Sequence, residues 1–183
     1  MGAGNGRHRQ ARGFSLLELV VVIVIIGVLL VMAISRLLPY LDEAERVAVL
    51  TVESQLKNTL VLEAAQRIVR GESRTIAELE QVNPMALLLE APDNYVGEYR
   101  SADSLPERRW YFDPERRRLV YKVGEPYTPA LRDRSWRNPE FEVRIIFQDR
   151  DADGVFDAAT DELFGVRLQR MAGAEWLAVG RRS

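Results

Sequence analysis

The chain of 183 residues contains no cysteine, and its only histidine, His8, lies close to the amino terminus. Without cysteine it can form neither a disulfide bond nor a thiolate nucleophile. Histidine is the usual acid–base group near neutral pH and the commonest zinc ligand. If the amino terminus is removed, the remaining chain lacks this group as well. These absences exclude most familiar catalytic constellations, and only catalysis by carboxylates stays open.

A strong excess of charge of one sign is also absent. The chain has 25 lysine and arginine residues against 27 aspartate and glutamate residues, for a formal net charge of -2. This balance creates no overall field that would attract nucleic acid. The length accommodates one domain with a sizeable core and an accessory segment, but not two large domains.

What is present is a long apolar run near the amino terminus. Residues 1–13 carry arginines and no acidic residue, and the run from Phe14 to Ile34 follows at once. As a helix this run spans about 30 Å, the thickness of the hydrocarbon core of a bilayer. Because a basic flank tends to stay in the cytoplasm, the pattern predicts one membrane crossing, with the rest of the chain outside the cytoplasm.

Glu18 interrupts this run, and a charge there needs an explanation. At the bilayer centre a carboxylate costs about 2.5 to 3.5 kcal/mol. In one interpretation Glu18 lies near the interface, where it reaches water or becomes protonated. In the other, a peptidase cuts between Gly13 and Phe14, and the new amine of Phe14 becomes the counter-charge. Pairing between staggered neighbouring helices would then set the axial register of an assembly.

The segment Gly13–Glu18, with the apolar run that follows, resembles the prepilin cleavage and methylation motif of type IV pilins and type II secretion pseudopilins. The resemblance implies cleavage after Gly13 by a prepilin peptidase, N-methylation of Phe14 and an assembly role for Glu18. It implies a structural subunit in the bacterial inner membrane, with its carboxyl-terminal domain in the periplasm. The implied partners are other pilin or pseudopilin subunits in a helical filament, the inner-membrane assembly platform and, before assembly, membrane lipid.

The chain departs from the family pattern at Ser35, where many members have a proline, and it carries Pro39 instead. Since a proline kinks a helix, the position of the bend is open. Within the resemblance, the lack of cysteine favours a pseudopilin or minor pilin, because many pilus shaft subunits carry a carboxyl-terminal disulfide.

Two other interpretations of the amino terminus remain. A signal peptide would be cleaved after the apolar run, where Ala33-Ile34-Ser35 offers a small-x-small pattern. An uncleaved anchor would give a monomeric bitopic membrane protein whose extracytoplasmic domain binds a ligand. Both leave Glu18 unexplained.

The periodicity predicts how the chain is divided. We expect residues 1–13 to form a cleaved leader, 14–38 the transmembrane half of a long helix, and 39–183 an extracytoplasmic globular domain. The domain includes the amphipathic second half of the helix, which should end near Arg70 because Gly71 follows. The predicted buried stripe of this half is Ala44, Val47, Leu50, Ala64 and Ile68, with Glu45, Glu53, Lys57 and Arg67 on the wetter face.

The rest of the chain predicts short helices followed by strands. A capping-box pattern at Thr75 and Glu78 predicts a helix through about Val82, and a second helix is expected at 85–90. Strand patterns follow at 95–99, 110–112, 119–123, 141–147, 162–169 and 175–179. The expected fold is α+β, a long amino-terminal helix packed on an antiparallel β-sheet, which agrees with the pilin resemblance.

Arginines gather in the predicted hairpin around residues 107–123; they are Arg108, Arg109, Arg116, Arg117 and Arg118. Aromatic residues lie among them, as on some surfaces that bind nucleic acid. We favour a solvated hairpin face, and nucleic acid is not an expected partner.

An acidic segment near the carboxyl end predicts a calcium loop. Asp149, Asp151 and Asp153 alternate before a glycine, and Asp157 and Asp161 follow. Alternate oxygen ligands around a sharp turn suit a hard cation such as Ca²⁺, although a threonine stands where an EF-hand has its bidentate glutamate. An acidic turn without metal explains the same residues, so both interpretations stay open. No nucleophile–base pair or phosphate loop accompanies them, and we do not expect an enzyme.

Overall fold

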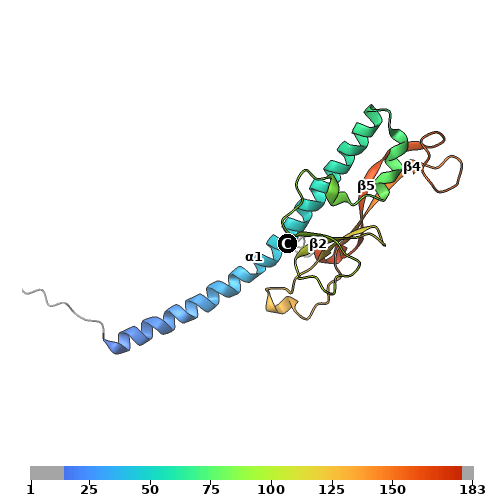
Figure 1. The fold of residues 1–183 in the computed structure, drawn as a ribbon. Helices are drawn as coiled ribbons and strands as arrows, with labels where there is room; N and C mark the ends of the chain where they lie inside the picture. The colour runs from blue at the N-terminus through green and yellow to red at the C-terminus, as the bar shows by residue number, and fades with distance from the viewer. Residues whose placement is uncertain (1–14, 179–183) are drawn as a thin grey trace, which may run out of the picture.

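The computed structural model describes residues 15–178, and one long helix dominates it (Figure 1). Helix α1 covers Leu16–Val69, 54 residues. Ser15 caps its first turn by accepting a hydrogen bond from the Glu18 N–H at 3.2 Å. Gly71 follows its last turn with φ at +76°, a conformation that glycine adopts without strain. The predicted end of the helix near Arg70 is confirmed.

The first half of α1 projects away from the rest of the molecule as a stalk, and the second half packs against the folded domain (Figure 1). The side chains of residues 16–34 are exposed. The helix continues through Pro39 without a break, even though proline removes one backbone donor from the ladder. Stalk and domain therefore share one continuous helix.

Five strands form a single sheet in the order β1-β2-β3-β4-β5. Their bounds are Tyr95–Glu98, Arg109–Asp113, Arg118–Lys122, Glu140–Gln148 and Glu162–Ala172. The pairs from β2 to β5 are antiparallel, whereas β1 runs parallel to β2. The α+β arrangement is confirmed, and the expectation of a wholly antiparallel sheet is wrong at β1. The segment after β1 turns back along the sheet, where Leu105 packs on Tyr111 and Val120, so β2 starts again from the same end as β1.

The short helix expected through about Val82 is present as a 3₁₀ helix, η1 (Ser73–Glu80), but the predicted capping box is wrong, because the hydroxyl of Thr75 donates to the Glu72 carbonyl at 2.9 Å. A second local prediction is also wrong. The expected strand at 175–179 is a short helix, α2 (Ala174–Ala178). Within α2 the adjacent residues Trp176 and Leu177 are both buried. In a strand, adjacent side chains point to opposite faces of the sheet, so only one of the two would face the core. Two further 3₁₀ turns are η2 (Pro84–Leu87) and η3 (Pro129–Leu131).

The hydrophobic core lies between the second half of α1 and one face of the sheet. Helix α1 supplies Val49, Leu56, Leu60 and Ala64, and the residues that meet them include Ile76, Leu79, Trp110, Phe141, Val143 and Leu168. Each fully buried leucine of this kind stabilises the fold by about 2 kcal/mol. The core therefore fixes the position of the domain on the upper half of the helix.

The buried face of α1 differs from the predicted stripe. Val47 and Ile68 are each 50% exposed, whereas Glu53, expected on the wetter face, is 1% exposed. The buried positions run Asp42, Arg46, Val49, Glu53, Leu56, Leu60 and Ala64. Asp42 and Glu53 are tolerated on this face because a loop and strand β5 supply their partners. Arg46 pairs instead with Glu43 of the same helix, at 2.6 Å.

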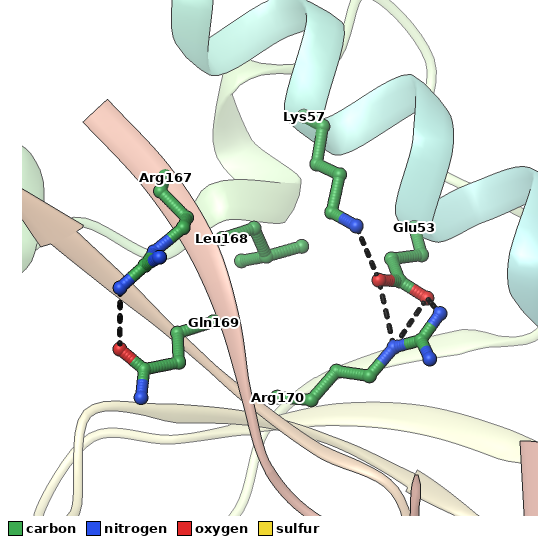
Figure 2. Close-up of a pocket in the computed structure, with 6 residues that line it drawn as sticks. All are labelled: Glu53, Lys57, Arg167, Leu168, Gln169 and Arg170. Carbon is green, nitrogen blue, oxygen red and sulfur yellow. Dashed lines mark hydrogen bonds and ion pairs between the residues drawn. The ribbon is translucent and has the colours of Figure 1, made fainter. Parts of the chain in front are cut away.

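Glu53 joins α1 to β5 through a cluster of charge-assisted hydrogen bonds, shown in Figure 2. The Nε atom of Arg170 donates to Oε1 and Oε2 at 2.9 and 3.0 Å, and its Nη2 atom donates to Oε2 at 2.6 Å. Lys57 approaches Oε1 at 2.6 Å. The buried carboxylate is thus fully paired, as a charge in that position must be.

Two further carboxylates of α1, Asp42 and Glu45, hold the loop that follows β3. Asp42 accepts hydrogen bonds from the N–H groups of Tyr127 and Thr128 at 2.8 and 2.9 Å. Glu45 accepts from the Tyr121 hydroxyl and the Gly124 N–H, both at 3.1 Å. These contacts lie on the part of α1 nearest the stalk, so they define where the domain begins.

Acidification is expected to weaken these helix contacts. Burial acts to raise the pKa of Glu53, but hydrogen bonds from Arg170 and Lys57 outweigh it and hold the pKa below the ordinary 4.5. Burial of Asp42 is likewise outweighed by hydrogen bonds from Thr128 and Tyr127, so its pKa lies below the ordinary 3.8. A carboxylate with a lowered pKa stabilises the fold above its unfolded pKa and loses this contribution as pH falls toward its folded value.

Thermal unfolding of the purified chain in detergent should therefore show a constant Tm from about pH 7 to about pH 5 and a falling Tm below about pH 4.5. Circular dichroism at successive pH values measures this. A Tm that stays unchanged down to about pH 3 would contradict the role assigned to the two carboxylates.

Candidate functional site

The first turn of α1 presents Glu18 at the end of the stalk. Its side chain is exposed, and its backbone N–H is bound by the Ser15 hydroxyl. Gly13 and Phe14, the predicted cleavage and methylation positions, lie outside the described residues. The helix thus places the carboxylate in the turn next to the predicted new amine, where the positive end of the helix dipole also favours a negative charge.

The stalk has the length and composition of a membrane span. Within α1 an 18-residue window reaches a mean hydropathy of 3.2, and none of that window is buried against the folded domain. A helix of this kind inside a soluble core would be covered by neighbouring elements. Because no described element covers it here, lipid or other helices are the natural surroundings of the stalk.

The side of α1 that faces away from the sheet is less apolar than the stalk but also uncharged, and residues 87–90 of the domain border it at Gln55, Asn58 and Leu62. The exposed side chains on this side of α1 are uncharged from residue 44 to the end of the helix; they are Ala44, Val47, Ala48, Thr51, Gln55, Asn58, Leu62, Ala65 and Val69. Charged residues make up 28% of the whole chain, so a face of this length without one is unusual. We call these residues the uncharged back face; small and uncharged side chains let another helix approach closely.

The acidic loop joins β4 to β5 at the end of the domain remote from the stalk (Figure 1). The structure brings three of the five predicted ligands together, because carboxylate oxygens of Asp149, Asp151 and Asp153 all lie within 4.8 Å of one another. Asp149 accepts a hydrogen bond from the Gly154 N–H at 2.9 Å, which closes the turn. This oxygen set fits a hard cation such as Ca²⁺.

The other two predicted ligands serve the loop backbone. Asp161 accepts hydrogen bonds from the N–H groups of Arg150 and Asp157, at 3.0 and 2.8 Å. Asp157 accepts one from the Ala159 N–H at 2.8 Å. These bonds occupy Asp157 and Asp161 in the second half of the loop, and the structure does not gather them into the cluster of three.

The neighbouring carboxylates affect the pKa of Asp151. The hydrogen bond from the Asp153 N–H lowers its pKa, but desolvation and the nearby carboxylates outweigh that bond, and the pKa of Asp151 is raised overall. Crowding of this kind is relieved by a bound cation.

The basic cluster of the β2–β3 hairpin is largely balanced by carboxylates of the same chain. Arg116 and Arg118 both pair with Glu140, at 2.8 and 2.6 Å. Arg108 pairs with Glu45 of α1 at 3.0 Å. Guanidinium groups engaged in this way are tied to the domain, which fits the solvated hairpin face better than a phosphate-binding surface.

The sequence pattern of α1 does not identify Asp42 and Glu45 as the residues that position the domain on the helix. Asp42 and Glu45 bind partners that lie 63 to 86 residues further along the chain. In the sequence they look like ordinary solvent-facing residues of an amphipathic helix. Only the long-range fold identifies them as anchors.

Comparison with protein families gives one match. The model for the prokaryotic N-terminal methylation motif matches residues 8–34, a stretch that contains Gly13, Phe14 and Glu18. No curated protein and no solved structure matches the chain. The chain therefore carries the hallmark of type IV pilin-like and pseudopilin-like proteins, and the resemblance seen in the sequence is confirmed.

Proposed function

We propose that the chain is a structural subunit, a pseudopilin or minor pilin, of a type II secretion pseudopilus or a type IV pilus-like filament. The observation that carries the proposal is the methylation motif at the head of a continuous helix whose first half is apolar and uncovered. A motif of this kind supplies the processing site, and the helix supplies the element that enters both membrane and filament.

In this proposal the chain is processed before it assembles. A prepilin peptidase cleaves between Gly13 and Phe14, removes the basic leader 1–13, and the new Phe14 amine is N-methylated. Residues 14–38 hold the subunit in lipid of the inner membrane, and residues 39–183 lie in the periplasm. The assembly platform of the inner membrane then brings the subunit together with other pilin or pseudopilin subunits.

The helix surfaces suit assembly rather than catalysis. The stalk and the uncharged back face present one nearly charge-free surface along α1, and helices bury such surfaces against one another. Glu18 is then the natural counter-charge for the Phe14 amine of a neighbouring subunit, since a charge left unpaired among apolar helices is costly.

The mature amino terminus tests the proposal directly. The chain is expressed in a host with a prepilin peptidase, and intact-mass and peptide mass spectrometry compare the wild type with Gly13→Ala. We expect the wild type to begin at N-methylated Phe14 and the variant to keep residues 1–13. Cleavage after Ser35 would indicate a secreted domain, and an intact leader on the wild type would favour the monomeric bitopic membrane protein.

For the acidic loop we propose a structural calcium site held by Asp149, Asp151 and Asp153. A bound Ca²⁺ would offset the repulsion among the carboxylates and order the loop between β4 and β5. The support is the gathering of three carboxylates around a tight turn.

We predict that millimolar Ca²⁺ slows hydrogen exchange of loop amides 149–161 in the purified full-length chain. Mg²⁺, which prefers a tighter octahedral site, should do so less. Asp151→Asn removes one charge from the set and should abolish the protection, while Glu162→Gln, outside the set, should keep it. Equal exchange with Ca²⁺ and with a chelator would show the loop to be an acidic turn without metal.

A further inference from the structure

The sheet has two free edges, and their charges are opposite. Strand β5 pairs with β4 alone, and β1 pairs with β2 alone, among the described residues. Backbone groups on a free edge are a template for another strand. We therefore consider what each edge presents.

The β1 edge is acidic. Glu90, Asp93 and Glu98 lie in and just before β1, and all three are exposed. None of them forms an ion pair within residues 15–178. Because β2 is the only strand paired with β1 among the described residues, the outer edge of β1 is not covered by another strand, and it carries unbalanced negative charge.

The β5 edge is basic. Two open grooves of about 410 and 400 Å³ lie between α1 and this strand. The first is lined by Glu53, Lys57, Arg167 and Arg170. Glu53 pairs with Lys57 and Arg170, so Arg167 is the cation of this groove that it does not neutralise. Figure 2 shows Arg167 pointing away from the Glu53 cluster. Among the described residues its side chain forms one hydrogen bond, which it donates to Gln169 at 3.5 Å, and no ion pair. Arg144 lies directly across the strand pair, but it is paired with Glu142 at 3.0 Å, so the unbalanced charge of this edge is that of Arg167.

These charges favour one mode of pairing between copies. Two β5 edges would bring Arg167 against Arg167, and two β1 edges would bring acidic groups together, so both symmetric modes are repulsive. A β1 edge against a β5 edge joins opposite charges. This contact uses different surfaces on the two copies, so it is heterologous and repeats without closing into a dimer.

Strand directions agree with this mode. Strand β1 runs with β2, and each following pair reverses, so β5 runs opposite to β1. A second copy placed beside the first in the same orientation therefore brings its β1 antiparallel to β5. All copies of α1 then point the same way, as a bundle of stalks requires.

We propose that β5 of one subunit accepts the β1 segment, residues 90–98, of a second copy of this chain, with Arg167 facing the β1 carboxylates. The inference rests on the proposed filament and goes beyond it, because it assigns the contact between neighbouring globular domains. The four residues of β1 make this a short contact that orients neighbours, while α1 supplies most of the buried surface.

A zero-length cross-link tests the contact. The lysines of the chain are Lys57 and Lys122, so Arg167→Lys places a reactive amine on β5 while keeping the charge. Carbodiimide then couples this amine to an adjacent carboxylate in membranes or filaments of the full-length chain. The β1 and β5 edges of one copy are about 19 Å apart across the sheet, too far for coupling within a molecule.

We expect peptides that join the introduced amine at position 167 to the 90–98 segment, in a ladder of multimers. Adding Glu90→Gln, Asp93→Asn and Glu98→Gln should abolish these peptides. In the wild-type background, without the introduced amine, Glu98→Arg and Arg167→Glu should each reduce the yield of sheared filaments. The double variant should restore this yield, because it exchanges the charges of the two edges.

The outcomes separate the two proposals. A processed chain that forms multimers but links the introduced amine elsewhere, or a double variant without recovery, overturns the edge contact and leaves the filament intact. A chain that keeps its leader and forms no multimers overturns both.

Discussion

Replacing Glu18 with alanine is expected to leave processing at Gly13 intact and to abolish assembly. In the proposed filament the methylated amine of Phe14 lies among apolar helices, and Glu18 is its partner. Removing one member of a buried pair costs about 3 to 5 kcal/mol, which corresponds to a loss of more than about a hundredfold in association at each contact. Cross-linked multimers and sheared filaments, counted against membrane-bound subunits, measure the effect.

Glu18→Asp is the matched control, because it keeps the charge on a shorter side chain. It should retain part of the assembly, whereas Glu18→Gln, which keeps the size and loses the charge, should behave like alanine. If the glutamine variant assembles as well as the wild type, the charge has no role, and Glu18 is better explained by its place in the first turn of α1.

Glu53→Gln is expected to destabilise the folded domain by about 2 to 3 kcal/mol. Glutamine fits the same space, but it leaves Arg170 and Lys57 facing each other without an anion. The loss is smaller than for a fully buried pair, because the Arg170 side chain is 31% exposed and water replaces part of the interaction. Urea unfolding of the purified chain in detergent gives the change in the free energy of unfolding.

Glu162→Gln supplies the comparison for this measurement. Glu162 pairs with Arg150 at 2.6 Å, the same distance as the shortest Glu53 contact, but both side chains are more than half exposed. An exposed pair contributes about 0 to 1 kcal/mol. Equal effects of the two substitutions would mean that burial of Glu53 adds nothing to its stabilising role.

The helix and most strands follow from local sequence, because their periodicity reports which face is buried. This is why the end of α1 near Gly71 and the β2–β3 hairpin were predictable. The parallel placement of β1 was not, since it depends on the packing of Leu105 over the sheet. The segment 174–178 has apolar residues compatible with either element, and its helix is set by the joint burial of Trp176 and Leu177.

The candidate site divides in the same way. Residues 8–34 carry a motif that is recognisable without any structure, and the alternation of Asp149, Asp151 and Asp153 shows in three dimensions as one cluster. Glu53 was predicted to lie on the solvent-facing side of the helix, because a charged residue on an amphipathic helix ordinarily faces water, but it is buried. Its partner Arg170 is 117 residues away, and no local pattern connects the two.

The continuity of α1 through Pro39 has a mechanical consequence. A helix of 54 residues is a rod about 80 Å long. The domain is fastened to this rod at Asp42, Glu45 and Glu53, on one face of the helix. A pull along the stalk loads these contacts together in shear, and no flexible joint lies between the stalk and the domain to absorb the displacement. Axial force applied at one end of α1 therefore displaces the helix and the domain by the same distance, as one rigid body.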